Sequence, residues 1–135
     1  MIKLTIPGPP CAKQRPRMTK QGHTYTPKET INAETLIKQL YITEHFNKQL
    51  NGALELSVFA YFPIPKSANK KQREAMLKGD IRPTKKPDWD NVGKLVSDAL
   101  NGLAYHDDSS IVAAHVYKWY SDEPRVEVEI QEIGA

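Results

Sequence analysis

The sequence predicts an α+β domain: a mixed, mostly antiparallel sheet of about four strands, with helices packed on one face. Some segments alternate apolar and polar residues with the period of a half-buried strand, whereas others carry apolar residues at helical spacing. Along the chain these segments follow the order β-α-β-α-α-β-β. A length of 135 residues suits one domain with its own core, so residues 1–135 are expected to form a single unit.

The N-terminal part of the chain predicts a strand, a loop and a long helix. Apolar residues alternate with polar ones over residues 2–6, and prolines end the pattern at Pro7. The following stretch, through Tyr25, has no periodicity and is expected to be a basic loop. The sequence TPKE at residues 26–29 has the pattern of a capping box with proline at the first helical position. We expect the helix that begins there to continue to about Leu50.

The middle of the chain predicts a strand and then two helices. Residues 53–62 alternate cleanly and form the second strand, which prolines terminate. Residues 67–77 are rich in good helix formers and predict a polar helix. Residues 79–87 are expected to be a loop, and a further helix is expected from about residue 91 to residue 101, with Gly102 beyond its end.

The C-terminal part predicts two strands joined by a short turn. The first strand covers residues 111–120, the turn covers 122–124, and the second strand covers 125–131 with its apolar residues on one face. Because only a short turn separates them, we expect these two strands to pair as a hairpin.

Composition and charge favour a protein of the cytoplasm that binds a polyanion. Hydrophobic residues make up 39% of the chain and charged residues 26%, a globular balance, and the net charge is +3. Basic residues gather in residues 13–20 and 66–86, which suits nucleic-acid binding, although solvated loops would look the same. No apolar run could cross a membrane, and no signal-peptide pattern is present. The single Cys11 permits neither an internal disulfide nor a cysteine-based zinc site.

An unusual concentration of aspartates surrounds the helix predicted at residues 91–101. Asp88 and Asp90 stand two residues apart, and the sequence HDD brings Asp107 and Asp108 shortly after the helix. At 3.6-residue spacing, Asp90 and Lys94 fall opposite the apolar stripe, whose members are Val92, Leu95, Val96, Ala99 and Leu103. A strand that folds back along the helix could bring Asp107 or Asp108 near Asp88 and Asp90.

Each aspartate also has a structural explanation. Asp90 is a good N-cap, Asp98 could pair with Lys94 one helical turn away, and HDDSS is a typical turn sequence. Taken singly, these explanations are favoured. Together they leave Asp88 unexplained, since a helix needs one cap, and five aspartates between residues 88 and 108 exceed what caps and turns require.

A shared metal ion explains the group better. Close carboxylates repel one another unless a cation lies between them or one takes a proton. Oxygen ligands without Cys favour Mg²⁺ or Mn²⁺ over zinc. A calcium loop of the EF-hand type fails, because Val92 and Ala99 stand where oxygen ligands are needed. Such a metal could activate a water against a phosphodiester, and Lys94 could meet the charge that develops on the phosphate.

The motif KPDWDNVGKLVSDALNG, followed by HDDSSI, resembles the RusA-type Holliday junction resolvases, endodeoxyribonucleases common in prophages. The shared pattern is D-x-D-N-x-x-K, then D-A-L, then a D-D turn before a strand. The resemblance implies a homodimer that binds four-way DNA junctions and makes paired symmetric nicks with Mg²⁺, for which Mn²⁺ is a possible substitute.

By position, the resemblance implies metal ligation by Asp88, Asp90 and Asp108 and a catalytic role for Lys94. Asp107 takes the less critical place, and for Asp98 a structural role is favoured. Candidate DNA-binding residues come from two basic stretches. Lys85 and Lys86 flank the acids, and Lys13, Arg15 and Arg17 lie in the N-terminal stretch. Their N-terminal pattern matches only part of the family. For His106 and Trp89, structural roles are favoured over ligation and base stacking.

Three rival interpretations stay open at this point. The protein could be a metal nuclease for another branched DNA, a non-catalytic DNA-binding module with the same basic surface, or a structural protein whose acids only cap helices and turns. Intact Asp88, Asp90, Lys94 and Asp108 argue against a silent module.

Overall fold

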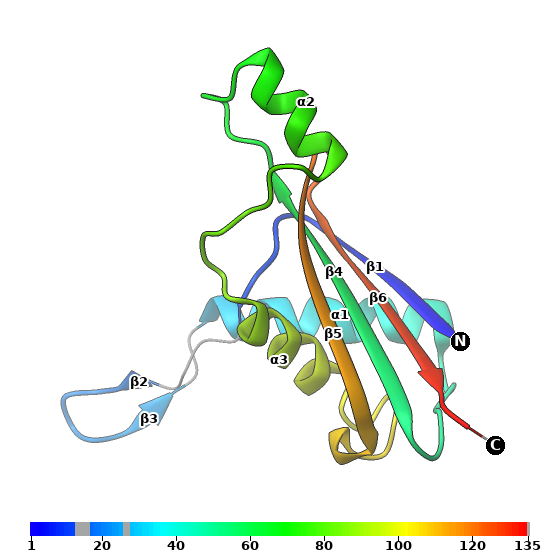
Figure 1. Cartoon of the computed structure of the whole chain (residues 1–135). Coiled ribbons are helices and arrows are strands. Elements are labelled where there is room, and N and C mark those ends of the chain that lie inside the picture. Colours follow the sequence, from blue (N-terminus) through cyan, green and yellow to red (C-terminus); the bar gives the residue numbers. More distant parts are fainter. Residues whose placement is uncertain (13–16, 26–27, 135) are drawn as a thin grey trace.

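The computed structural model describes residues 1–12, 17–25 and 28–134. A four-stranded sheet has the order β1-β6-β4-β5. Strand β1 (Ile2–Pro7) pairs antiparallel with β6 (Arg125–Glu132), β6 pairs antiparallel with β4 (Leu54–Pro63), and β4 pairs parallel with β5 (Ile111–Ser121). The sheet is mixed and mostly antiparallel, which confirms the predicted α+β class (Figure 1).

The predicted hairpin between the last two strands is wrong, because β4 lies between β5 and β6. Ser121 at the end of β5 lies opposite Pro63, and Arg125 at the start of β6 lies opposite Tyr61 on the other side of β4. The short turn therefore crosses over the end of β4. A three-residue turn can close a hairpin or step over one strand end, and local spacing does not distinguish the two.

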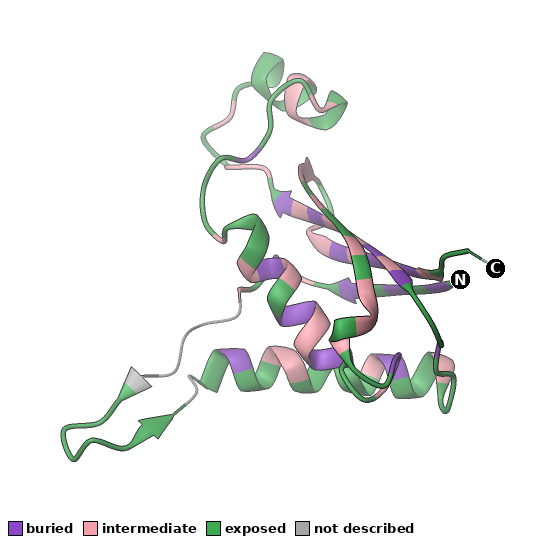
Figure 2. Ribbon diagram, turned by 60° about the horizontal axis from the view of Figure 1, so that its bottom comes forward, coloured by how far each residue is buried: buried purple, intermediate pink, exposed green. Residues whose placement is uncertain are grey.

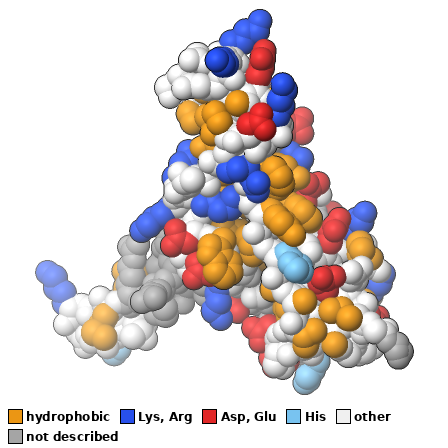
Figure 3. All heavy atoms as spheres, in the orientation of Figure 1, with side chains coloured by type: hydrophobic (Ala, Val, Ile, Leu, Met, Phe, Trp, Pro, Cys, Tyr) orange, Lys and Arg blue, Asp and Glu red, His pale blue; other side chains and the backbone are white. Residues whose placement is uncertain are grey.

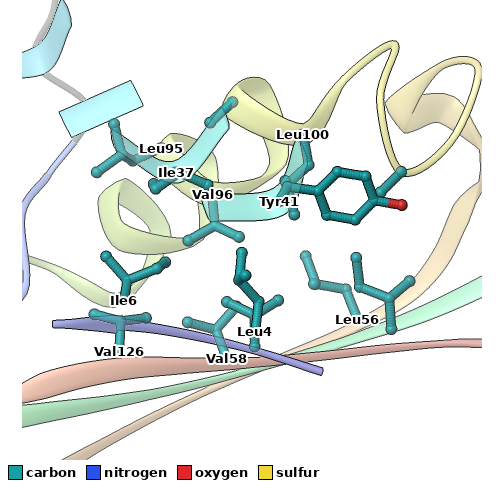
Figure 4. Close-up of a cluster of buried hydrophobic side chains, with 14 of the residues drawn as sticks. Leu4, Ile6, Ile37, Tyr41, Leu56, Val58, Leu95, Val96, Leu100 and Val126 are labelled. Atoms are coloured by element: carbon teal, nitrogen blue, oxygen red, sulfur yellow. The ribbon is translucent and has the colours of Figure 1, made fainter. Parts of the chain in front are cut away.

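Two helices cover one face of the sheet. Helix α1 (Lys28–His45) contacts β1, α3 (Trp89–Leu100) contacts β5, and the two helices contact each other. Both helices carry buried positions along their length (Figure 2), and buried side chains of the helices meet the apolar faces of β1, β4 and β6 (Figure 4). Most of the predicted apolar stripe of α3 is buried, namely Val92, Leu95, Val96 and Ala99, whereas Leu103 lies beyond the helix end.

The end of α1 and the start of α2 differ from the prediction. Helix α1 ends at His45 rather than near Leu50, because Phe46 has a positive φ of 46° and the backbone N–H of Leu50 instead donates to the Ala104 carbonyl. Its predicted start at residues 26–27 lies outside the described residues. Helix α2 (Lys70–Lys78) starts later than expected, after a capping box formed by Asn69 and Gln72.

Two further small elements complete the described structure. The predicted basic loop contains a short antiparallel ribbon of β2 (Arg17–Met18) and β3 (Thr24–Tyr25). A single 3-10 turn, η1 (Asp108–Ser110), precedes β5. Helix α2 does not cover the sheet but projects past one end of it (Figure 1). No described helix has the length and apolarity that a membrane span requires.

Candidate active site

Three of the predicted catalytic residues line one cavity beside the edge strand. The cavity has a volume of about 290 Å³ and lies between α3 and β5. Helix α3 contributes residues that share one side of a helix: Trp89, Asp90, Gly93, Lys94 and Ser97. Strands β4 and β5 contribute an apolar floor of Leu56, Ile111, Ala114 and Val116, and η1 contributes Asp108. Asp90, Lys94 and Asp108 therefore face a common space.

Gly93 sets how closely the helix approaches this floor. A Cβ atom at Gly93 would lie 3.2 Å from the Cγ2 atom of Val116, which is closer than most such contacts. The absent side chain lets the middle of α3 lie against β5 and leaves the cavity open between Asp90 and Ser97. In the sequence, the signal that could have predicted this close packing of α3 on β5 is a glycine within a helical pattern.

The first turn of α3 carries two carboxylates that no capping bond occupies. The sequence suggested Asp90 as the N-cap of this helix. The helix begins at Trp89, so its N-cap is Asp88. Asp88 makes no side-chain capping bond, and Asp90 lies inside the first turn. A carboxylate there is stabilised by the helix dipole without using its oxygens. Both groups are exposed and remain open to a ligand.

The two acids of the HDD turn are held differently. Asp107 is the N-cap of η1 and accepts a hydrogen bond from the Ser109 N–H at 3.4 Å. Hydrogen bonding with the Ser109 side chain, and then with its backbone, lowers the pKa of the Asp107 carboxyl. Asp108 instead has its backbone N–H bound by the Asn101 Oδ1 atom at 3.1 Å, and its side chain lines the cavity. In this turn, therefore, the Asp107 carboxylate has a structural role, whereas the Asp108 carboxylate remains available at the cavity.

A buried tyrosine anchors this turn to α3. The Tyr105 hydroxyl donates to the Ser97 carbonyl oxygen at 2.6 Å, and Tyr105 is almost fully buried. Burial raises the pKa of Tyr105 strongly, with smaller contributions from the charges of Asp108, Asp98 and Asp107. Asp98, Asp107 and Asp108 all lie around the C-terminal end of α3, where their negative charges add.

Lys94 is the cation within this negative region. Its Nζ atom lies 3.4 Å from Asp98 Oδ1, one helical turn along α3, as the sequence predicted. The Lys94 side chain is 61% exposed whereas that of Asp98 is 22% exposed, so the lysine end remains accessible from solvent. Asp98 thus pairs with a lysine that lines the cavity together with Asp90 and Asp108.

The donor set fits a hard divalent cation in kind, although the carboxylates are not gathered into a closed cage. Within the described ranges, no group of three His, Cys, Asp or Glu side chains could hold a metal ion together. Asp90 lies in the first turn of α3 while Asp108 is bound at Asn101, about 16 Å further along the helix axis. Asp88 does not line the cavity. Mg²⁺ commonly uses one or two carboxylates together with substrate phosphates.

The predicted DNA-binding residues fall into two groups. Lys85 and Lys86 are exposed on the segment that leads into α3, and the Lys85 carbonyl accepts a hydrogen bond from Lys118 Nζ at 2.6 Å. Lys13 and Arg15 lie outside the described residues, as does the side chain of Arg17. Of the predicted DNA-binding side chains, the described part of the structure places those of Lys85 and Lys86, on the segment that leads into α3.

Several residues that shape the site were not identified from the sequence. Asn101 and Tyr105 hold the Asp108 turn through tertiary hydrogen bonds that spacing does not reveal. Trp89, expected to pack, is 64% exposed and lines the cavity instead. His106 is exposed and absent from the cavity lining.

A larger cavity of about 360 Å³ lies elsewhere, between α1, α3 and the end of β1. Its lining is mostly apolar and includes a single carboxylate, Glu29. Because it lacks converging polar groups, it offers no chemistry comparable to that of the cavity beside β5.

Comparison with known proteins points to one family. The family model described as Endodeoxyribonuclease RusA matches residues 7–131. An uncharacterized protein of Bacillus subtilis, YqaN, is 40% identical over 139 aligned residues, which cover 99% of this chain and 98% of the relative.

Proposed function

Because the chain belongs to the RusA endodeoxyribonuclease family, we propose that it is an Mg²⁺-dependent endonuclease that resolves four-way DNA junctions by paired symmetric nicks. The observation that supports this proposal most is the cavity shared by Asp90, Lys94 and Asp108. Capping and turn formation do not account for these three side chains, because Asp90 makes no cap and Asp107 alone caps η1.

In the proposed reaction the chain's own residues bind, orient and stabilise the phosphodiester. Asp88, Asp90 and Asp108 would hold Mg²⁺, or Mn²⁺ as a substitute, beside the phosphate, and to share one ion they would have to lie closer together than they do in this structure. When bound, that ion would polarise the phosphoryl group and lower the pKa of a water molecule. Lys94 would donate a hydrogen bond to a phosphate oxygen as negative charge grows in the transition state. Without a cation, the carboxylates would repel the DNA.

Asp98 would orient Lys94 before the substrate arrives. Its carboxylate pairs with the Lys94 ammonium, which would limit the rotamers that the long side chain visits. Lys85 and Lys86 would bind phosphates next to the cut, and Lys13, Arg15 and Arg17 would bind further phosphates. A homodimer would present two such sites to the two-fold symmetry of a junction. Action on DNA also accords with the cytoplasmic location expected from the sequence.

A panel of DNA substrates tests the proposal. End-labelled four-way, three-way, flap and duplex DNA would be incubated with the protein, with and without Mg²⁺. We expect paired symmetric nicks in the four-way DNA that depend on the metal. Cleavage of flaps or three-way DNA instead would favour a nuclease for other branched DNA, and binding without nicks would favour a non-catalytic module.

A further inference from the structure

Helix α2 forms without contributing to the core. None of its residues is buried, although caps close both ends: Asn69 and Gln72 bond reciprocally at its start, and Gly79 takes a left-handed φ of 86° at its end (Figure 2). Most protein helices derive their stability from an apolar face packed on the core. Because none of its residues is buried, α2 has its surface exposed on most sides, and that surface is accessible to a partner.

We define the basic arm as residues 66–86, which include α2. The arm holds eight of the 19 Lys and Arg residues but only two of the 16 Asp and Glu residues, so the rest of the chain has 11 basic residues against 14 acidic ones. Lys and Arg side chains gather over α2 and the segment that descends from it (Figure 3). The arm is therefore one of two strongly basic stretches of the chain, the other being residues 13–20.

Three lysines of α2 form no hydrogen bond or ion pair that would tie them to the described part of the fold. Lys70 and Lys71 lie in the first helical turn, where the helix dipole disfavours cations and where no acidic residue compensates them. Lys78 falls on the same side of the helix, within about 100° of both. No hydrogen bond or ion pair involves these ammonium groups in the part of the chain that the structure describes, whereas Arg73 pairs with Asp122.

The arm is attached firmly to the end of β5. The Arg82 guanidinium carbon lies 3.4 Å from the centre of the Trp119 ring, and Arg82 Nε donates to the Lys118 carbonyl at 2.6 Å. Gly79 lies against the same ring, so closely that a Cβ atom there would be 2.6 Å from Trp119 Cζ3. Lys118 Nζ in turn bonds the Lys85 carbonyl. These contacts give the lysines of α2 a defined position relative to α3.

We propose that the basic arm is a second DNA contact, in which Lys70, Lys71 and Lys78 bind backbone phosphates of a duplex arm away from the cut. This inference rests on the proposed function for the identity of its ligand. Lysines present compact charges without the planar fork that reads bases, so the contact would be independent of sequence. Its attachment beside Asp88 would orient the duplex as well as retain it.

The test compares two triple variants that remove equal charge. In the arm variant, Lys70→Ala, Lys71→Ala and Lys78→Ala are combined; in the control, Lys3→Ala, Lys38→Ala and Lys48→Ala are combined, all at exposed positions outside the arm. Binding to four-way DNA is measured without divalent metal across a range of salt concentrations. Alanine favours helix, so the arm variant should keep its circular dichroism and melting temperature.

We expect the arm variant to lower the slope of log affinity against log salt by about 2–3 and to weaken binding at 0.1 M salt on the order of 10–100-fold. The control should change both much less. Equal losses of DNA affinity in both variants would mean that only the net charge of the protein matters, and this would overturn the inference. Wild-type binding by the arm variant would overturn it while leaving the nuclease proposal intact.

The two proposals fail in distinguishable ways. If the wild-type protein binds DNA in an arm-dependent manner but does not cut it in Mg²⁺, the nuclease function fails and the arm contact stands. If the wild-type protein binds no branched or duplex DNA at all, both proposals fall together.

Discussion

The proposed chemistry depends on single side chains, and Asp90 is the most informative of them. Its competing structural explanation was that of a helix cap, but α3 begins earlier, so Asp90 is not the N-cap and lines the cavity. The change from Asp90 to Asn keeps the shape of the side chain and removes its charge, so it separates metal binding from packing. The same reasoning does not apply to Asp107, whose oxygen is used by η1.

We predict that Asp90→Asn abolishes cleavage but leaves junction binding intact or tighter. Loss of a charged metal ligand should slow single-turnover cleavage by at least about 100-fold, whereas removing a negative charge near the phosphates should not weaken binding. Glu132→Gln makes the same charge change at the exposed end of β6 and serves as the control. Rapid cleavage by Asp90→Asn in Mg²⁺ would remove this residue from the mechanism.

At the level of secondary-structure elements, the turn that joins α3 to β5 is the connection that depends most on tertiary contacts. Tyr105 bonds the Ser97 carbonyl, and Asn101 bonds the backbone of Asp108. These two bonds fix the position from which Asp108 enters the cavity. The stability of this turn should therefore respond to the loss of one hydroxyl group.

We predict that Tyr105→Phe lowers the free energy of unfolding by about 1 kcal/mol, because a buried hydrogen bond is lost. Urea denaturation measures the change. Tyr117→Phe is the matched control, since Tyr117 is 40% exposed and its ring stacks on Phe59 without depending on the hydroxyl. Equal destabilisation by the two variants would mean that the Tyr105–Ser97 bond does not anchor the turn.

Elements with a strong local period could be predicted from sequence, and those set by tertiary contact could not. The alternation in residues 53–62 and the stripe of Val92, Leu95 and Val96 have one reasonable interpretation each, and the structure confirms both. The order of strands depends on whether a short turn closes or crosses, which residues 122–124 do not encode. Local period likewise does not show that Asn101 holds Asp108.

In the site, too, some residues could be identified from the sequence, whereas others could be identified only from tertiary contacts. Asp90, Lys94 and Asp108 were identified from residue types and spacing together with the family resemblance, and they line one cavity. The convergence of Asp88 with Asp90 and Asp108 on one ion stays a prediction. Gly93 and Trp119 were not assigned because their roles appear only when α3 and the basic arm lie against β5.

For the complete protein, the proposed paired nicks require two sites in one particle. We predict that co-expression of wild-type chains with an excess of Asp90→Asn chains yields mixed dimers, which nick only one strand of a junction. A supercoiled plasmid with an extruded cruciform reports this directly, because paired nicks give linear DNA and single nicks give open circles. Wild-type protein alone should give linear product. Unchanged linear product with mixed chains would exclude cutting by paired subunits.

The measurement that tests the central claim most directly is single-turnover cleavage of four-way DNA in Mg²⁺ by Asp108→Asn and Asp107→Asn. These neighbours differ in where their carboxylates go, since one lines the cavity and the other caps η1. The account predicts that Asp108→Asn loses cleavage while retaining junction binding, and that Asp107→Asn stays within a few-fold of wild type. Wild-type cleavage by Asp108→Asn would contradict it.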